Sequence, residues 1–184
     1  MAIIEKYQEL VDKCKDYPIV YVTGPQRSGT TFCANILARD LQYKWVDESR
    51  FSNHSFRRFK GYCKDNHVIQ CPALSHRVLD FDSKGIIVWM KRNLQDVLKS
   101  EDRINWHPIE FEVERKKYLD TFPNHKDKIQ NFNRSKPMKD FFWENVQKDY
   151  LNIEYVEFNY EGLRESSGWV DKERRVKFKS KQIK

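Results

Sequence analysis

Hydrophobic and polar positions along the chain follow two periods, one typical of helices and one typical of strands. Helical spacing of apolar side chains predicts helices at residues 3–14, 31–41 and 139–151. Short apolar runs predict strands at residues 19–23, 43–46, 68–71, 85–90 and 153–158. Residues 105–137 are rich in charged and aromatic side chains without a clean period, and we expect helices there. Strands that alternate with helices predict a doubly wound α/β fold around a central parallel sheet.

The length of the chain sets the number of domains. Its 184 residues, 39% of them hydrophobic, suffice for one buried core, so we expect residues 1–184 to form a single domain. No apolar window reaches the roughly 18 residues of a membrane span, and the charged N-terminal segment does not resemble a secretory signal. We therefore predict a cytoplasmic protein without a membrane span.

The cysteines and the net charge exclude two further classes. Cys14, Cys33, Cys63 and Cys71 form no CxxC pair and have no matched histidine spacing, which indicates reduced thiols and no metal site. The net charge is +7, but residues 170–184 hold seven Lys or Arg against two acids. Most of the excess positive charge thus lies in a basic C-terminal segment. Such segments are usually solvated, and we expect no nucleic-acid partner.

One loop carries candidate chemistry. Between the first predicted strand and the second predicted helix lies GPQRSGTT, Gly24 to Thr31. A glycine loop at such a junction presents several backbone N–H groups and the positive helix end to one point, which favours a bound oxyanion. A turn in which the glycines only shape the backbone is the alternative. An arginine, a serine and two threonines crowd into the turn, and they favour anion binding.

The loop lacks one residue of an ATP-hydrolysing protein. Thr30 stands where nucleotide triphosphatases carry the lysine that reaches the β- and γ-phosphates, and Arg27 supplies the cation instead. No apolar strand ends in an aspartate that would complete a magnesium site. Both features argue against ATP, although an ATP-dependent small-molecule kinase remains an alternative.

Two stretches resemble a known family. GPQRSGTTF resembles the 5'-phosphosulfate-binding loop of sulfotransferases that use 3'-phosphoadenosine 5'-phosphosulfate (PAPS). GIIVWMKRNLQDVLKS, Gly85 to Ser100, resembles the 3'-phosphate element of that family, with Arg92 after an apolar strand and Ser100 eight residues later. The resemblance covers residues 18–100 well and residues 152–164 loosely. It implies a P-loop nucleoside-kinase-like three-layer fold, with PAPS as the donor and its desulfonated form, PAP, as the product.

The resemblance also implies which residues hold the donor nucleotide. They are Gln26, Arg27, Ser28, Gly29, Thr30, Thr31, Arg92 and Ser100. Arg92, at the carboxyl end of a strand, and Ser100 can bracket one phosphate. Arg27 would also neutralise the bridging oxygen as the nucleotide leaves. Family members carry a basic loop over the nucleotide near the C-terminus.

That basic loop would correspond here to the segment that begins SGWVDKERR. Trp169 would then stack on adenine, and Arg174 and Arg175 would contact the nucleotide. A solvated tail is the alternative.

The acceptor side offers a base and one departure from the family pattern. Glu48 follows a predicted strand and can take the proton of an acceptor hydroxyl, although a carboxylate that only starts a helix is the alternative. Rival bases are His54, His76 and His107, because other branches of the family use histidine. Gln70 stands where many members carry a lysine that assists the bridging oxygen, so either another cation serves or transfer is slow.

These features predict a sulfotransferase that moves a sulfuryl group from PAPS to a hydroxyl or an amine. The acceptor could be a glycan, a small metabolite or a tyrosine, and the sequence leaves it open together with the oligomeric state. A PAP-binding protein without catalysis and the ATP-dependent kinase are the alternatives.

Overall fold

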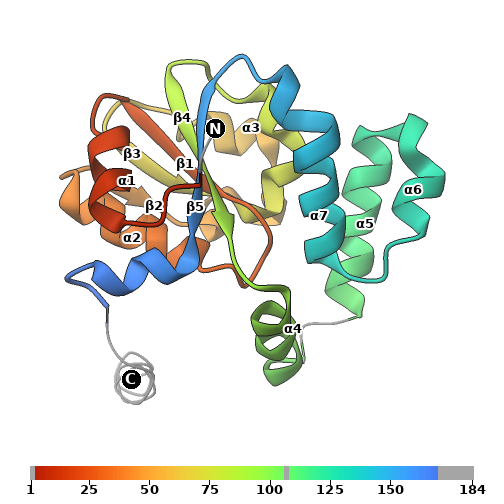
Figure 1. The fold of residues 1–184 in the computed structure, drawn as a ribbon. Coiled ribbons are helices and arrows are strands. Elements are labelled where there is room, and N and C mark those ends of the chain that lie inside the picture. Colours follow the sequence, from red (N-terminus) through yellow and green to blue (C-terminus); the bar gives the residue numbers. More distant parts are fainter. Residues whose placement is uncertain (1–2, 106–107, 170–184) are drawn as a thin grey trace.

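A computed structural model describes residues 3–105 and 108–169, apart from the side chains of residues 52–54, and shows a layered α/β fold (Figure 1). The central sheet consists of β1 (Ile19–Thr23), β2 (Lys44–Val46), β3 (His67–Gln70), β4 (Gly85–Lys91) and β5 (Glu154–Asn159). All paired strands are parallel, in the order β2-β3-β1-β4-β5. The predicted α/β class, with helices around a central parallel sheet, is confirmed.

Segments of helix cover both faces of the sheet, because the inner strands are apolar on both sides. All five residues of β1 are buried, as are six of the seven in β4. One face packs against α1 (Tyr7–Cys14), α2 (Thr30–Asp40) and the 3₁₀ segment η6 (Tyr160–Glu165). The other packs against the 3₁₀ segments η1 (Glu48–His54) and η2 (Pro72–Asp80), α3 (Phe56–Lys60) and the π-helical turn η4 (Trp143–Gln147). On that face Trp89 of β4 stacks on Trp143, with ring centroids 4.3 Å apart.

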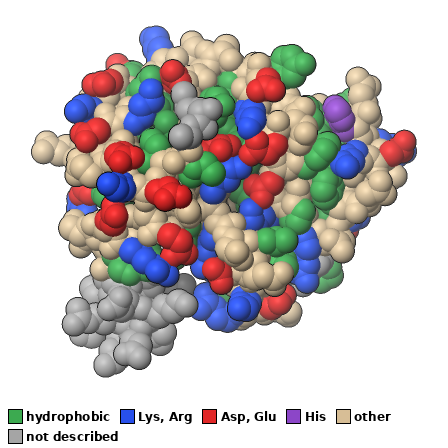
Figure 2. All heavy atoms as spheres, in the orientation of Figure 1, with side chains coloured by type: hydrophobic (Ala, Val, Ile, Leu, Met, Phe, Trp, Pro, Cys, Tyr) green, Lys and Arg blue, Asp and Glu red, His purple; other side chains and the backbone are tan. Residues whose placement is uncertain are grey.

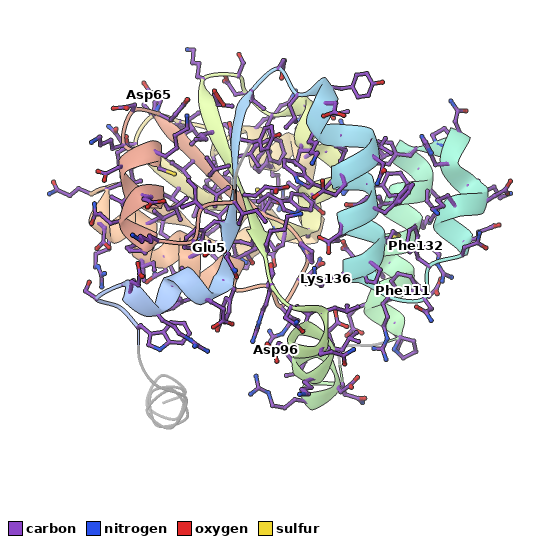
Figure 3. All side chains as sticks on the ribbon, viewed as in Figure 1. Glu5, Asp65, Asp96, Phe111, Phe132 and Lys136 are labelled. Atoms are coloured by element: carbon purple, nitrogen blue, oxygen red, sulfur yellow. The ribbon has the colours of Figure 1, made fainter. Side chains whose placement is uncertain are left out.

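The remaining helices lie beside the sheet. After β4 comes α4 (Leu94–Arg103), followed by α5 (Ile109–Thr121), the 3₁₀ turn η3 (Pro123–His125), α6 (Lys126–Gln130), α7 (Ser135–Phe142), and after η4 the 3₁₀ turn η5 (Lys148–Tyr150). In Figure 1, α5, α6 and α7 form a unit to the right of the sheet. This unit has a small core of its own, to which Phe111 of α5 contributes, with Phe132 packed against it (Figure 3).

Two predicted helices have different bounds in the structure. The first begins at Tyr7 and not at residue 3, because Ile4 is extended and pairs with β5. Its N–H donates to Glu157 O at 2.8 Å, and its carbonyl accepts from Asn159 N at 3.0 Å. The helix predicted at 139–151 begins at Ser135 and ends at Phe142. Pro137 lies in its first turn, where a missing N–H costs no hydrogen bond.

The surface of the described residues is mixed. Figure 2 shows Lys and Arg side chains interspersed with Asp and Glu over the visible face, and several of the basic ones lie along its lower part, near α4 and the carboxyl end of β4. No helix among the described residues is long and apolar enough to cross a membrane.

Candidate functional site

The candidate site lies where the parallel strands end. The loop after β1, the start of η1 after β2, the start of η2 after β3 and the residues after β4 all follow carboxyl ends, and these ends share one edge of the sheet. In open α/β sheets, ligands bind outside this edge, where neighbouring connections diverge to opposite sides. The connections here diverge on either side of β1, so its loop occupies that position.

The loop between β1 and α2 has the backbone of an anion cradle. Gly24 has φ +125° and Gly29 has φ +91°, values that side chains other than hydrogen rarely allow. A Cβ on Gly29 would also lie 2.4 Å from the ring of Tyr160. No side chain caps α2 and its first turn carries no acid, so its N-terminal N–H groups and positive dipole end are available to a ligand.

The structure brings the two predicted nucleotide elements together. Arg27 Nε donates to Ser100 Oγ at 3.1 Å, and Arg92 Nη1 donates to the carbonyl oxygen of Arg27 at 2.7 Å. The loop after β1 and the segment after β4 therefore form one continuous cationic surface.

More positive than negative charge surrounds Arg27. Burial lowers the pKa of Arg27, and the nearby Arg103 and Arg92 lower it further, while Glu101 opposes them. Glu101 is itself buried, and burial raises the pKa of its carboxyl. Like charges this close favour an added anion, because arginine stays protonated at any physiological pH.

The other loop residues occupy different positions relative to the surface. Ser28 is fully buried, and its hydroxyl donates to the carbonyl oxygen of Pro25 at 2.5 Å. Thr30 is buried at the start of α2, whereas Thr31 is exposed. Gln26 is half-buried, and its side-chain oxygen accepts hydrogen bonds from α7. The predicted ligands therefore divide into exposed groups and groups that hold the loop in shape.

Tyr160, which the sequence did not single out, belongs to this site. Its ring lies under the guanidinium of Arg92, with Arg92 Cζ 4.1 Å from the ring centroid, and against Gly29. Trp169 packs edge-on against Tyr160 and against Phe32, with centroids 5.9 and 5.7 Å apart. Trp169 thus packs beside α2 and Tyr160, and its contact with adenine stays a prediction.

Glu48 lies at the carboxyl end of β2, at the same edge of the sheet as the loop. It follows β2 directly, and its Oε2 accepts from the backbone N–H of Ala73 at 3.3 Å. The neighbouring Asp47 accepts from Ser49 N at 2.9 Å and so takes the helix-start role that was the alternative for Glu48. Burial raises the pKa of Glu48, although the Ala73 N–H and the charge of Lys139 oppose the rise. A carboxylate with a raised pKa is suited to accept a proton.

Gln70 ends β3 and is almost fully buried, and its Oε1 has no hydrogen-bond partner among the described groups. The sequence identified no cation near Gln70, but the structure places a lysine close by. Lys139 of α7 donates to the carbonyl oxygen of Pro72, two residues after Gln70, at 2.9 Å. Helical periodicity alone marks Lys139 as an ordinary helix residue, so no sequence signal identified it.

Of the rival bases, His76 is less suited than Glu48 to accept a proton. The other rival bases and the C-terminal arginine candidates have side chains that the structure does not describe. His76 is mostly buried, and burial lowers its pKa to about 3, so it is neutral at pH 7. His54 has no described side chain. His107, Arg174 and Arg175 lie outside the described residues.

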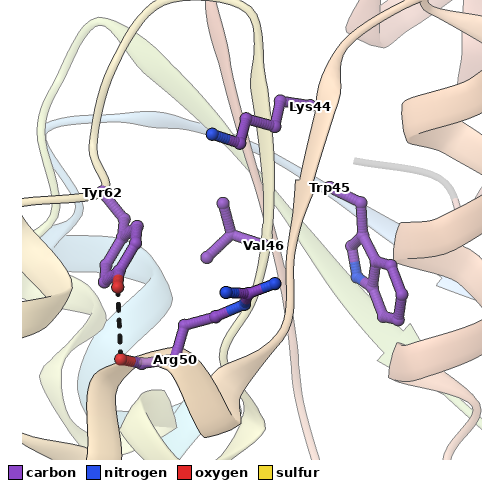
Figure 4. A pocket seen from close by; sticks show the side chains of 5 residues that line it. All are labelled: Lys44, Trp45, Val46, Arg50 and Tyr62. Carbon is purple, nitrogen blue, oxygen red and sulfur yellow. Dashed lines mark hydrogen bonds between the residues drawn. The ribbon is translucent and has the colours of Figure 1, made fainter.

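A small hollow of about 120 Å³ lies beside β2, lined by Lys44, Trp45, Val46, Arg50 and Tyr62 (Figure 4). Tyr62 donates its hydroxyl to Arg50 O at 3.3 Å. In the sheet β3 separates β2 from β1, and none of the predicted nucleotide ligands lines the hollow.

Glu114 of α5 makes the site sensitive to acid. Burial alone would raise the pKa of Glu114, but Lys139 and Lys117 outweigh it and lower the pKa from 4.5 to about 2. A carboxyl with a lowered pKa in the folded chain adds stability above pH 4.5, and that stability is lost as the pH falls toward 2. We expect this residue to contribute about 3 kcal/mol of unfolding free energy that disappears over that interval.

Urea unfolding of the wild type and of Glu114→Gln at several pH values between 6 and 2.5 measures this contribution. The free energy of unfolding should fall more steeply with decreasing pH in the wild type than in Glu114→Gln. Glu112→Gln, which removes an exposed carboxylate from the same helix, is the matched control and should keep the wild-type slope. Equal slopes in Glu114→Gln and the wild type would contradict the prediction.

Comparisons with known proteins leave the family open. No family model matches the chain, and no curated protein matches it. Among solved structures, the chain is similar to shikimate kinase from Acinetobacter baumannii in complex with shikimate, at 16% identity and a TM-score of 0.39, covering 74% of this chain and 95% of that one. A likeness of this degree says nothing about what this chain binds. The fold and the loop themselves define the class: an α/β protein with a P-loop between β1 and α2.

Proposed function

We propose that this protein is a PAPS-dependent sulfotransferase. The observation that supports it most is the contact between the two cationic elements, in which Arg27 reaches Ser100 at 3.1 Å and Arg92 reaches the loop carbonyl at 2.7 Å. PAPS carries anions at both its 5' and 3' positions, and two adjacent arginines on separate elements suit such a ligand. Thr30 in place of the loop lysine argues against a triphosphate.

The proposed reaction exchanges one sulfur–oxygen bond for another. The acceptor hydroxyl oxygen bonds to sulfur, the bond between sulfur and the 5'-phosphate oxygen breaks, and PAP leaves with that bond's electron pair. Glu48 takes the acceptor proton. Arg27 and the amides of the loop stabilise the charge that develops on the leaving oxygen, where fixed donors contribute most to rate.

Selectivity for the 3'-phosphate tests the proposal. We expect the wild type to bind PAP more tightly than AMP, and Arg92→Ala to weaken PAP binding by about 10- to 100-fold, because a charge-assisted hydrogen bond contributes about 1.5–3 kcal/mol. AMP lacks the 3'-phosphate, so its affinity should change little. Isothermal titration calorimetry with PAP, AMP and ATP with magnesium measures all three affinities.

The same titrations distinguish the alternatives. Tight binding of ATP with magnesium, without a preference for PAP, would indicate a small-molecule kinase. Tight binding of PAP without turnover of PAPS against any alcohol, phenol or amine would indicate a binding protein without catalysis. PAP release from PAPS in the presence of these acceptors is the observation that supports a sulfotransferase.

A further inference from the structure

A buried lysine of α7 contacts both sides of the candidate site. Lys139 has no exposed surface, and its ammonium donates to Oε1 of Gln26 in the loop and to the carbonyl oxygen of Pro72 after β3. Glu114 Oε2 lies 2.6 Å from the same nitrogen. Two of the three N–H donors of the ammonium thus go to Gln26 and Pro72, and its contact with Glu114 is an ion pair.

This contact fixes the side-chain amide of Gln26. Its Oε1 accepts from Lys139 and, at 3.4 Å, from Ser135 Oγ. Because two donors of α7 point at this position, the amide must place its oxygen there, and its nitrogen is turned away from α7. Among the described groups, none accepts a hydrogen bond from Gln26 Nε2. An anion held in the loop would be the acceptor that these N–H groups lack.

Glu114 does not neutralise Lys139 by itself. Glu114 is shared, because its Oε1 also pairs with Lys117 Nζ at 2.7 Å. Two lysines and this carboxylate leave one positive charge, and the carboxylate that interacts with it from the end of β2 is Glu48. A buried ion pair adds little net stability over apolar packing. Stability alone therefore does not explain why this charge adjoins the loop.

We propose that Lys139 is a positioning residue of the donor site: it holds Gln26 with both amide N–H groups toward the bound nucleotide, and it keeps a fixed positive charge between the loop and Glu48. This inference rests on the proposed function. It assigns to α7 a role in the donor site that no feature of the loop itself reveals.

The fixed charge has a consequence for Glu48. Of the ionisable groups around Glu48, Asp47 and Glu114 favour its protonated form, Cys71 lies close by, and Lys139 favours its ionised form. Removal of the Lys139 charge should therefore raise the pKa of Glu48 further. If Lys139 served only to pair α7 with Glu114 of α5, its replacement need not change the orientation of Gln26 or the affinity for a nucleotide.

The test is a double-mutant cycle. Lys139→Met is combined with Glu114→Gln, so that no unpaired carboxylate stays buried, and PAP affinity is measured by calorimetry in this variant, in Gln26→Ala and in their combination. We expect each to weaken PAP binding about tenfold, as for one charge-assisted hydrogen bond, and the combination to weaken it no further. A ¹³C NMR titration of Glu48, assigned with Glu48→Gln, should show a higher pKa in Lys139→Met/Glu114→Gln than in Glu114→Gln alone, because the two differ only in the charge of Lys139.

Two further variants separate positioning from folding. Lys117→Met removes the other lysine on Glu114 and should leave PAP affinity and the Glu48 pKa unchanged. Lys139→Gln keeps N–H donors without the charge, so it should retain most PAP affinity and still raise the Glu48 pKa.

Each outcome bears on one proposal or on both. Additive losses in the cycle together with an unmoved Glu48 pKa would overturn the role of Lys139 and leave the sulfotransferase proposal intact. A wild type that binds no PAP would overturn both.

Discussion

Replacing Arg27 by alanine should lower the rate of sulfuryl transfer by about three orders of magnitude. Removal of one preorganised donor from a developing oxyanion costs about 10²–10³ in rate, and Arg27 also carries a full charge. The fold should survive, because Arg27 already has φ +63° and alanine inherits the same backbone conformation without new strain. PAP release from PAPS, with the acceptor that the wild type turns over fastest, measures the loss.

Arg164→Ala is the matched control for Arg27→Ala. Arg164 is exposed on η6 and pairs with Glu161 at 2.7 Å, so its loss changes the net charge by the same amount without touching the loop. Transfer should stay near the wild-type rate. If Arg27→Ala were as active as Arg164→Ala, Arg27 would have no part in the reaction.

Replacing Glu48 by glutamine should lower the rate by about 10²–10⁴-fold, the range for loss of a general base. The pH dependence identifies the group. Because burial raises the pKa of Glu48, the wild-type rate should fall as the pH drops through that pKa, when the carboxylate becomes protonated. Glu48→Gln should lack this limb. Rates measured from pH 4.5 to pH 9 at saturating PAPS test both expectations.

Asp47→Asn is the control for Glu48→Gln. Asp47 accepts from Ser49 N, and asparagine caps a helix about as well as aspartate, so the start of η1 should be kept. The fall in rate at low pH should persist in Asp47→Asn, shifted to lower pH because the charge of Asp47 raises the pKa of Glu48. A wild-type rate in Glu48→Gln would make another group the base. His76 would then be a poor candidate, because burial lowers its pKa to about 3 and so makes it a weak base.

The sequence predicted the sheet because the strands are short and apolar throughout. The predicted strand at residues 19–23 matches β1, since flanking Pro18 and Gly24 mark both ends. The helix predicted from residue 3 began too early, because Ile4 pairs with β5, which is distant in sequence. The predicted start at 139 was late because Pro137 is tolerated in a first turn.

The loop could be predicted because all its chemistry lies in eight consecutive residues. The proximity of Arg27 and Arg92 followed from strand ends that share one edge of a sheet. Lys139 could not be predicted, since it meets Gln26 across 113 positions of sequence and only the packing of α7 brings them together. Tyr160 was missed for a similar reason, because its contact with Gly29 requires β5 and the loop to be neighbours in space.

The pairing of Ile4 with β5 makes the two margins of the sheet unequal. The backbone beyond β5 already has a partner, whereas among the described residues no segment pairs with the outer side of β2. A second chain that extended this sheet at β5 would meet Ile4 beside Phe158, whereas at β2 it would meet no described segment. That margin is only three residues long and carries Lys44, which disfavours such growth and helps to keep neighbouring molecules apart.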